Sequence, residues 1–546
     1  MVDIRKKPFD LSGAQAAWVR QTLAGMSIEE KAGQLFCVMG QDYAPETLRQ
    51  MTAQGRIGGI LFRPEPAERI RSRYAPLDAA ARIPLLKAAN LEEGGTGGLS
   101  DGTLFGWPML TAATDDLRTA ERFGRVCAVE GRSVGINWTF SPVCDIDMNF
   151  RNPITNVRTF GSDPERVKAM AARYVEAVQG CGMAACAKHF PGDGVDYRDQ
   201  HLHPTYNSLP AAQWYDTYGA IYRELIDRGL MSVMVGHIVQ PAVAMEINPA
   251  LRLEDCLPAS LSPELLTGVL RGRLGFNGVI TSDATIMGGY CMAMERRRAI
   301  PASIAAGCDM LVFNTDFEED YRYLLGGIED GTVSLQRLDD AVTRILALKA
   351  RVCFAPPCRE TAEGVAWQCE AAERAVTLVK NNRPDILPVT PQRYPAIRLI
   401  VLGKDSISGG SVTQMAKALL EAQGFDVEVY NPMEDDLHGT SALSGRRLTL
   451  YLANYEQASN QTTVRIDWCK KHALDTPRFV GEEPCVFVSL ANPYLLQDVP
   501  RVPVYINAYT ASHAVIEAVI GKLLRGGPFE GVSPVDAFCG LPDTRL

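Results

Sequence analysis

Short apolar runs recur along the first 314 residues, and each is followed by polar or Gly-rich residues and then by a helical pattern such as residues 162–182 or 260–275. Because the runs are almost continuously apolar, they are typical of parallel strands that are buried on both faces. The pattern predicts eight strands: QLFCVMG (34–40), GGILF (58–62), IPLLKAAN (83–90), INWTFSPV (136–143), MAACAKHF (183–190), LMSVMVGH (230–237), NGVITSD (277–283) and CDMLVFN (308–314).

The alternation of eight strands with helices predicts an α/β fold, with a (β/α)8 TIM-type barrel over residues 1–352. An open, doubly wound sheet would need a Gly-rich phosphate loop after its first strand, and GQDYAPE (40–46) is not such a loop. The composition shifts to Pro and polar residues at 353–365, so residues 353–375 are predicted to be a linker. A second strand and helix alternation predicts a smaller α/β sandwich domain over residues 376–546, with strands in AIRLIVLG, FDVEVYN, RLTLYLAN, PCVFVSLAN and VPVYINAY.

Composition and charge restrict the class of partner. The net charge is -9 and the sequence has no basic run, so neither nucleic acid nor an anionic membrane is an expected partner. The amino-terminal residues contain no apolar stretch and no run approaches ~20 apolar residues, so neither a signal peptide nor a membrane helix is expected. Fourteen Cys without regular spacing do not form a disulfide framework, and the sequence predicts a cytoplasmic protein. The oligomeric state is left open.

Polar side chains follow the predicted strands at the points where they end. In a parallel barrel the active site lies at the carboxyl ends of the strands. Any one of these residues would be an ordinary helix cap or ion-pair partner, but together they predict a site at this end of the barrel. They are Asn90, Glu92, Glu93, Asp145, Asp147, Lys188, His189, His237, Asp283 and Asn314.

Two of the predicted loops carry groups that suit glycoside hydrolysis, in which a nucleophile and a proton donor flank the scissile bond. Asp283 ends an apolar strand and is the expected nucleophile, although it also fits a helix N-cap. His201 is the expected proton donor, because the carboxylate of Asp199 would fix its tautomer and raise its basicity. Pro and Gly residues at 191–194 are expected to let this loop move.

A metal site is the competing hypothesis for the same segment. His201, His203, His189 and His237 resemble a ligand set. Barrel amidohydrolases, however, place their His-x-His pair on the first strand, and the run at 34–40 contains no His. No metal and no cofactor are therefore expected.

Long segments of the chain resemble glycoside hydrolase family 3, in the order and at the spacing of that family. KHFPGDGVDYRDQH resembles the β-N-acetylglucosaminidase branch, in which KHFPG is followed by an Asp-x-His pair. The resemblance covers nearly the whole chain and implies a barrel followed by an α/β sandwich domain. The matching segments are 18–36, 140–147, 152–164, 188–201, 274–287, 377–382 and 386–389.

The resemblance implies a role for each matching residue. Asp283 would attack the anomeric carbon and form a covalent glycosyl-enzyme. His201, oriented by Asp199, would protonate the leaving oxygen and later activate water, so that the configuration is retained. The implied enzyme is a retaining exo-β-glycosidase, in the first place a β-N-acetylhexosaminidase. Side chains at four further positions are expected to hold the sugar: Lys188, His189, Arg158 and Glu92. Lys188 and Arg158 could instead be ordinary ion-pair partners of Asp145 or Asp163.

Two departures from the family leave the sugar open. The Asp and the Arg that usually grip the far hydroxyl groups are replaced by Leu91 and Leu99, and Asn90 or Glu92 would have to substitute for them. Another β-linked sugar, such as a glucoside or xyloside, is therefore an alternative. A phosphorylase is a further alternative, since a His repels phosphate less than a Glu does. A sugar-binding protein without turnover and a metal-dependent barrel hydrolase are the remaining classes.

Overall fold

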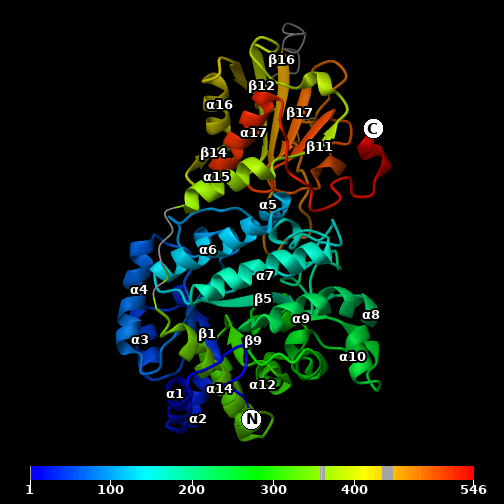
Figure 1. Ribbon diagram of the computed structural model, residues 1–546. Coiled ribbons are helices and arrows are strands. Elements are labelled where there is room, and N and C mark those ends of the chain that lie inside the picture. The colour runs from blue at the N-terminus through cyan, green and yellow to red at the C-terminus, as the bar shows by residue number, and fades with distance from the viewer. Residues whose placement is uncertain (1, 357, 359–362, 433–446, 471–472, 479) are drawn as a thin grey trace. The chain divides into compact units, whose positions relative to one another are not determined.

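The computed structural model describes residues 2–356, 358, 363–432, 447–470, 473–478 and 480–546 (Figure 1). The chain forms two compact units. The first comprises Met1–Leu104, Ala120–Asn152 and Pro164–Ala362, and the second comprises Phe105–Thr119, Pro153–Asp163 and Glu363–Leu546. The domain limits at residues 352 and 376 stay a prediction. Of the predicted linker, residues 357 and 359–362 lie outside the described residues, and helix α15 (Gly364–Ala375) forms its last part.

A closed barrel of eight parallel strands forms the centre of the first unit, which confirms the predicted (β/α)8 fold. Strands that are consecutive in the chain are neighbours in the barrel, and the last strand closes the ring by pairing with the first through Phe36 and Leu311. Each predicted apolar run forms one strand: β1 (Phe36–Met39), β2 (Gly59–Leu61), β3 (Leu86–Ala89), β4 (Trp138–Thr139), β5 (Ala184–Phe190), β7 (Ser232–Val235), β9 (Val279–Ala284) and β10 (Met310–Val312).

Helices surround the barrel, because each carries an apolar face that must be buried against the strands. In Figure 1, α7 lies along β5, and the two are in contact. The segment predicted as a helix at 260–275 forms the π-helical stretch η7 (Glu264–Arg273). The α-helices of this unit are α1 (Gly13–Ala24), α2 (Ile28–Gln34), α3 (Pro45–Ala53), α4 (Ala67–Ala80), α6 (Leu117–Ser133), α7 (Pro164–Gly180), α8 (Ala211–Trp214), α9 (Ala220–Asp227), α10 (Pro241–Ile247), α11 (Gly288–Cys291), α12 (Arg296–Ala306), α13 (Phe317–Glu329) and α14 (Leu335–Val352).

The second unit contains a six-stranded sheet in the order β11-β18-β17-β16-β12-β15, together with α5 (Pro108–Ala113), α15, α16 (Val412–Glu421) and α17 (His513–Arg525). This agrees with the predicted α/β sandwich. The sheet is parallel except at β11, an edge strand that the hydrophobic pattern does not identify because it is short and half polar. The strands are β11 (Thr377–Asn381), β12 (Ala396–Gly403), β15 (Asp426–Val429), β16 (Arg447–Asn454), β17 (Cys485–Ser489) and β18 (Val504–Asn507).

A buried ion-pair network fixes the end of the barrel opposite the predicted site. Asp309, which precedes β10, is fully buried and accepts hydrogen bonds from Arg271 (2.6 Å) and from the backbone N–H of Ile280 on β9 (2.9 Å). Arg337 also donates to it, and Arg344 lies 3.6 Å away. Burial alone would raise the pKa of Asp309, but these guanidinium groups lower it below its ordinary value.

We expect Asp309→Ala to lower the free energy of unfolding by about 3–5 kcal/mol, because it leaves buried guanidinium groups without their carboxylate. Since the pKa of Asp309 is lowered by folding, its contribution is present above the ordinary aspartate pKa and is lost as the pH falls through the folded value. Urea denaturation at neutral pH measures the effect. The control is Asp255→Ala, which removes an exposed pair with Arg252 (2.9 Å) and should leave the midpoint unchanged. Equal midpoints for the two variants would contradict the expectation.

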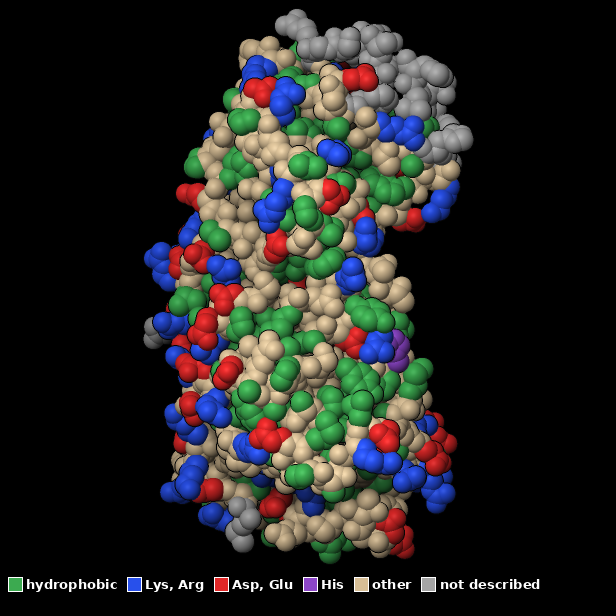
Figure 2. All heavy atoms as spheres, turned by 90° about the vertical axis from the view of Figure 1, so that its right-hand side faces the viewer, with side chains coloured by type: hydrophobic (Ala, Val, Ile, Leu, Met, Phe, Trp, Pro, Cys, Tyr) green, Lys and Arg blue, Asp and Glu red, His purple; other side chains and the backbone are tan. Residues whose placement is uncertain are grey.

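The surface does not segregate its charges on the face drawn in Figure 2, where Lys and Arg side chains alternate with Asp and Glu side chains. This mixture differs from the continuous basic surface of nucleic-acid-binding proteins. Among the described residues, none of the helices has the length and the apolar character needed to cross a membrane.

Candidate active site

The carboxyl ends of the barrel strands bring the predicted polar residues together. Lys188 and His189 lie near the end of β5, and Asp283 lies at the end of β9. Asn90 follows β3, and Asp145 comes after β4. Because the strands are parallel and closed into a ring, all of these ends meet at one edge of the barrel. The sequence pattern therefore placed the candidate site at the edge where the structure brings polar groups together.

Asp283 lies within range of several positive or protonatable groups. Its side chain is 13% exposed, and its Oδ2 lies 3.9 Å from Nε2 of His189. Burial alone would raise the pKa of this carboxyl, but His189, His237, His201 and, more weakly, Lys188 lower it below its ordinary value. Asp283 is therefore ionised at neutral pH, as a carboxylate nucleophile must be.

His201 and Asp199 form a hydrogen-bonded pair. Nδ1 of His201 lies 2.6 Å from Oδ1 of Asp199, which also accepts the backbone N–H of His201 (2.8 Å). The Asp199 side chain is fully buried, whereas that of His201 is 19% exposed. Because the carboxylate accepts a hydrogen bond from Nδ1, Nε2 is the nitrogen that can exchange a proton with a bound molecule. The pair has the geometry expected of an oriented acid/base.

His189 is held by Asp145, a residue that sequence reasoning noted only as a strand-end residue and as a possible ion-pair partner of Lys188 or Arg158. Oδ2 of Asp145 lies 2.6 Å from Nδ1 of His189, and Oδ1 accepts the backbone N–H groups of His189 (3.0 Å) and Asp193 (2.8 Å). These contacts turn Nε2 of the imidazole toward Asp283. The position of Asp145 after β4 places it at this end of the barrel, but no sequence pattern identifies His189 as its partner.

Lys188 pairs with Glu92 rather than with Asp145. Its Nζ lies 2.5 Å from Oε1 of Glu92 and 3.3 Å from Oδ1 of Asn90. Both substitutes that the sequence left open therefore face Lys188. The Leu91 side chain packs instead against the positions of Gly98 and Gly131, behind the strand. Glu92 and Asn90 thus supply the polar groups near the end of β3 that Leu91 lacks.

Arg158 belongs to the second unit. It lies on the 3₁₀ turn η3 (Asn156–Arg158), and its guanidinium donates to the carbonyl oxygen of Ile154 (3.3 Å). Its contact with the sugar stays a prediction.

The other two His of the metal hypothesis have different partners. His237 is fully buried, and its Nε2 donates to the carbonyl oxygen of Ala284 (3.0 Å) while Nδ1 accepts from the Ser260 hydroxyl (2.9 Å). Burial lowers the pKa of His237, so this imidazole is neutral and braces the residue after Asp283. His203 lies 3.4 Å from the carbonyl oxygen of Pro204. Within the described residues, no three His, Cys, Asp or Glu side chains are grouped as a metal site would require.

The Gly residues of the loop at 191–194 allow close packing. Gly192 has φ 118°, and a Cβ at this position would lie 2.1 Å from the Tyr218 ring. The Tyr218 hydroxyl donates to the carbonyl oxygen of Asp193 (2.6 Å), and the Trp214 indole donates to that of Pro191 (2.7 Å). Gly192 is therefore required by the approach of Tyr218, and the movement expected of this loop stays a prediction.

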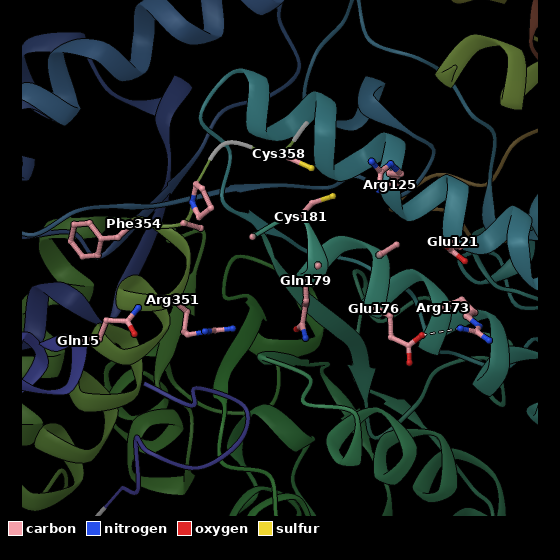
Figure 3. A pocket seen from close by; sticks show the side chains of 15 residues that line it. Gln15, Glu121, Arg125, Arg173, Glu176, Gln179, Cys181, Arg351, Phe354 and Cys358 are labelled. Atoms are coloured by element: carbon pink, nitrogen blue, oxygen red, sulfur yellow. Dashed lines mark hydrogen bonds and ion pairs between the residues drawn. The ribbon is translucent and has the colours of Figure 1, made fainter. Parts of the chain in front are cut away.

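A cavity of about 740 Å³ lies elsewhere on the first unit. Gly182, which lies just before β5, lines it, so it is near the amino ends of the strands, away from the predicted catalytic residues. In Figure 3 its Arg173 is paired with Glu176 (3.3 Å). None of the predicted site residues lines it, and we do not assign it to the active site. Its walls include Gln15, Glu121, Arg125, Arg173, Glu176 and Arg351.

Comparisons with known proteins identify the family of the chain. A family model described as "Glycosyl hydrolase family 3 N terminal domain" matches residues 27–348. The chain is 44% identical to a "Beta-N-acetylglucosaminidase/beta-glucosidase" of Cellulomonas fimi, and the match covers 100% of both chains. Among solved structures, a "Beta-glucoside phosphorylase BglX" is 43% identical with a TM-score of 0.93, covering 99% of both chains. A family 3 β-N-acetylglucosaminidase from Paenibacillus sp. str. FPU-7 is 24% identical with a TM-score of 0.79, covering 94% of this chain and 99% of that one, and shares the fold.

Proposed function

Because the chain belongs to glycosyl hydrolase family 3 and is a glycoside hydrolase, we propose that it is a retaining exo-β-glycosidase in which Asp283 is the nucleophile. His201 is the acid/base, and Asp199 orients it. The observation that carries the proposal is the His201–Asp199 pair, with Nδ1 and Oδ1 2.6 Å apart, on the loop after β5, at the same end of the barrel as Asp283 at the end of β9. A nucleophile kept ionised beside an oriented proton donor is the arrangement that double displacement requires.

The first displacement forms the glycosyl-enzyme. An oxygen of Asp283 attacks the anomeric carbon, and the bond from that carbon to the leaving oxygen breaks. Nε2 of the His201 imidazolium gives its proton to the leaving oxygen. The resulting neutral imidazole keeps the hydrogen on Nδ1, which stays hydrogen-bonded to Asp199. In the second displacement the same Nε2 takes a proton from the incoming acceptor, which attacks the anomeric carbon and releases Asp283 as a carboxylate.

The sugar itself is held by the groups around β3 and β5. Lys188 and Glu92 form a buried ion pair, the exposed Asn90 lies 3.3 Å from the Lys188 amine, and His189 is fixed by Asp145 beside the nucleophile. These groups offer both donors and acceptors to sugar hydroxyl groups. The C. fimi relative is named for both N-acetylglucosaminides and glucosides, and we propose that this chain accepts both, in terminal β linkage.

Phosphate is the second candidate acceptor. The similar structure with 43% identity is named as a β-glucoside phosphorylase. Once Asp283 is esterified it has no charge, so the charge of the acid/base determines whether an approaching phosphate is repelled. A carboxylate there would repel phosphate by about 4 kcal/mol per pair of unit charges 4 Å apart at an effective dielectric of 20. The neutral imidazole of His201 removes this repulsion.

The test is a panel of aryl β-glycosides, namely the N-acetylglucosaminide, N-acetylgalactosaminide, glucoside, xyloside and glucuronide, with and without millimolar phosphate. We expect the N-acetylglucosaminide and the glucoside to react fastest. With phosphate, we expect faster release of the aryl group and a glycosyl 1-phosphate of retained configuration, measured by phosphorus NMR. Free sugar as the only product under both conditions would reject phosphorolysis and leave the glycosidase. No turnover of any member would reject the glycosidase itself.

The cytoplasmic location expected from the sequence is also a proposal. It is supported by the fourteen Cys residues, none of which forms a disulfide bond in the part of the chain that the structure describes. Disulfide bonds are rare in reducing compartments and frequent in secreted proteins.

A further inference from the structure

Gln200, which separates Asp199 from His201, is fully buried although it lies in a loop. Its side chain makes two hydrogen bonds to other segments. Oε1 accepts the backbone N–H of His237 (2.8 Å), and Nε2 donates to Oδ2 of Asp193 (3.3 Å). A buried amide with both ends bonded fixes the loop that carries it, because breaking the contacts would leave polar atoms unsatisfied.

The two partners of Gln200 lead to the candidate nucleophile and to the candidate sugar contacts. His237 follows β7, and its imidazole donates to the carbonyl oxygen of Ala284, the neighbour of Asp283. Asp193 donates its backbone N–H to Asp145, which holds His189. The loop that carries Asp199 and His201 is called the acid/base loop. The Gln200 amide therefore connects this loop to the segments that position Asp283 and His189.

The backbone of the same loop is held against the segment that follows β9. The backbone N–H of Gly288 donates to the carbonyl oxygen of His201 (2.8 Å), and that of Gly289 donates to the carbonyl oxygen of Gln200 (3.2 Å). A Cβ on Gly289 would lie 2.4 Å from this Gln200 oxygen, and a Cβ on Gly236 would lie 2.8 Å from Oε1 of Gln200. The absence of a side chain at Gly289 and Gly236 thus allows the loop to lie close to the segments after β9 and β7.

We propose that Gln200 is a positioning residue that sets the place of the His201 imidazole relative to Asp283. This inference rests on the proposed function, since it concerns the proton donor of that reaction. Gln200 acts through His201 and not through contact with the sugar. Its hydrogen bonds keep the acid/base in place before the substrate arrives.

Gln200→Met tests the proposal, because Met has a similar length and makes neither hydrogen bond. The matched control is Gln240→Met. Gln240 is also fully buried, donates to the carbonyl oxygen of Leu209 (2.8 Å) and accepts the backbone N–H of Val243 (3.0 Å). The control therefore loses two comparable hydrogen bonds, but they do not involve the acid/base loop.

The measurement is kcat/KM for aryl β-glucosides whose leaving groups differ in pKa. Gln200→Met is expected to lower kcat/KM about 30-fold for a poor leaving group and less than about threefold for 2,4-dinitrophenolate, which departs without a proton. Gln240→Met should change both substrates by the same small factor. An equal loss on both substrates for Gln200→Met, or no loss on either, would overturn the proposal.

Two further variants keep the result interpretable. Gln200→Glu keeps an acceptor for the backbone N–H of His237 but places a carboxyl group against Oδ2 of Asp193 where the amide donor was, and it should give a loss with the same dependence on the leaving group. It replaces Gln200→Met if that variant does not fold, as judged by thermal unfolding. His201→Ala serves as the reference. If it shows no dependence on the leaving group, the proposed function fails; if it shows the dependence and the Gln200 variants do not, only the positioning role fails.

Discussion

Asp283→Ala is expected to lower kcat/KM on the order of 10⁵-fold for every β-glycoside in the panel, because it removes the atom that bonds to the anomeric carbon. Good leaving groups should not rescue the variant, since protonation is not the step that it loses. The pKa of Asp283 is lower than that of an ordinary aspartate, because His189, His237 and His201 outweigh the effect of burial. Wild-type activity on the acid side should therefore not be limited by protonation of Asp283 until the pH falls below that ordinary value.

The control for this substitution is Asp255→Ala, a change of the same chemistry at an exposed position that should keep wild-type rates. Thermal unfolding of both variants shows whether the fold is intact. Residual activity within tenfold of wild type in Asp283→Ala, measured on freshly purified protein, would show that another group is the nucleophile.

The second large effect is expected for His201→Ala. General acid catalysis contributes about 10²- to 10⁴-fold, so kcat/KM for glycosides with poor leaving groups should fall by that factor. For 2,4-dinitrophenyl glycosides the first displacement needs no proton, and kcat/KM should fall by less than about tenfold. The second displacement still needs a base, so kcat should fall and a small anion such as azide should restore it by attacking the glycosyl-enzyme directly.

Asp199→Asn isolates the role of the partner carboxylate. The amide cannot stabilise the imidazolium, although its oxygen can still accept the Nδ1 hydrogen. A loss of about 10²-fold on poor leaving groups is expected, with wild-type thermal stability. Equal rates for Asp199→Asn and wild type would remove Asp199 from the mechanism.

The fold was accessible from the sequence because its strands are buried on both faces. Each of the eight apolar runs became one barrel strand, with ends that shift by a few residues. The edge strand β11 was not predicted, because it is half polar. The π-helical stretch η7 could not be distinguished from an α-helix by its hydrophobic period. The segments 105–119 and 153–163 carry no sequence signal that they belong with the second unit.

The candidate site was partly accessible. Asp283, Lys188 and His189 end apolar strands, and that position alone marks them. The pairing of side chains within the site could not be predicted, because it depends on which side chains converge across the barrel. Nothing in the sequence shows that Asp145 binds His189 or that Glu92 rather than Asp145 binds Lys188. The Gln200 contacts are likewise visible only once β7 and the acid/base loop are placed side by side.

The proposed mechanism requires that a covalent sugar ester forms on Asp283. The direct measurement is mass spectrometry of the protein after reaction with 2-deoxy-2-fluoro-β-glucosyl fluoride, in which the fluorine slows the second displacement and lets the ester accumulate. We expect a mass increase of one fluorosugar, located in the peptide that contains Asp283 and absent from Asp283→Ala. An adduct on another carboxylate, such as Glu92 or Asp193, or turnover of the fluoride without any adduct, would contradict it.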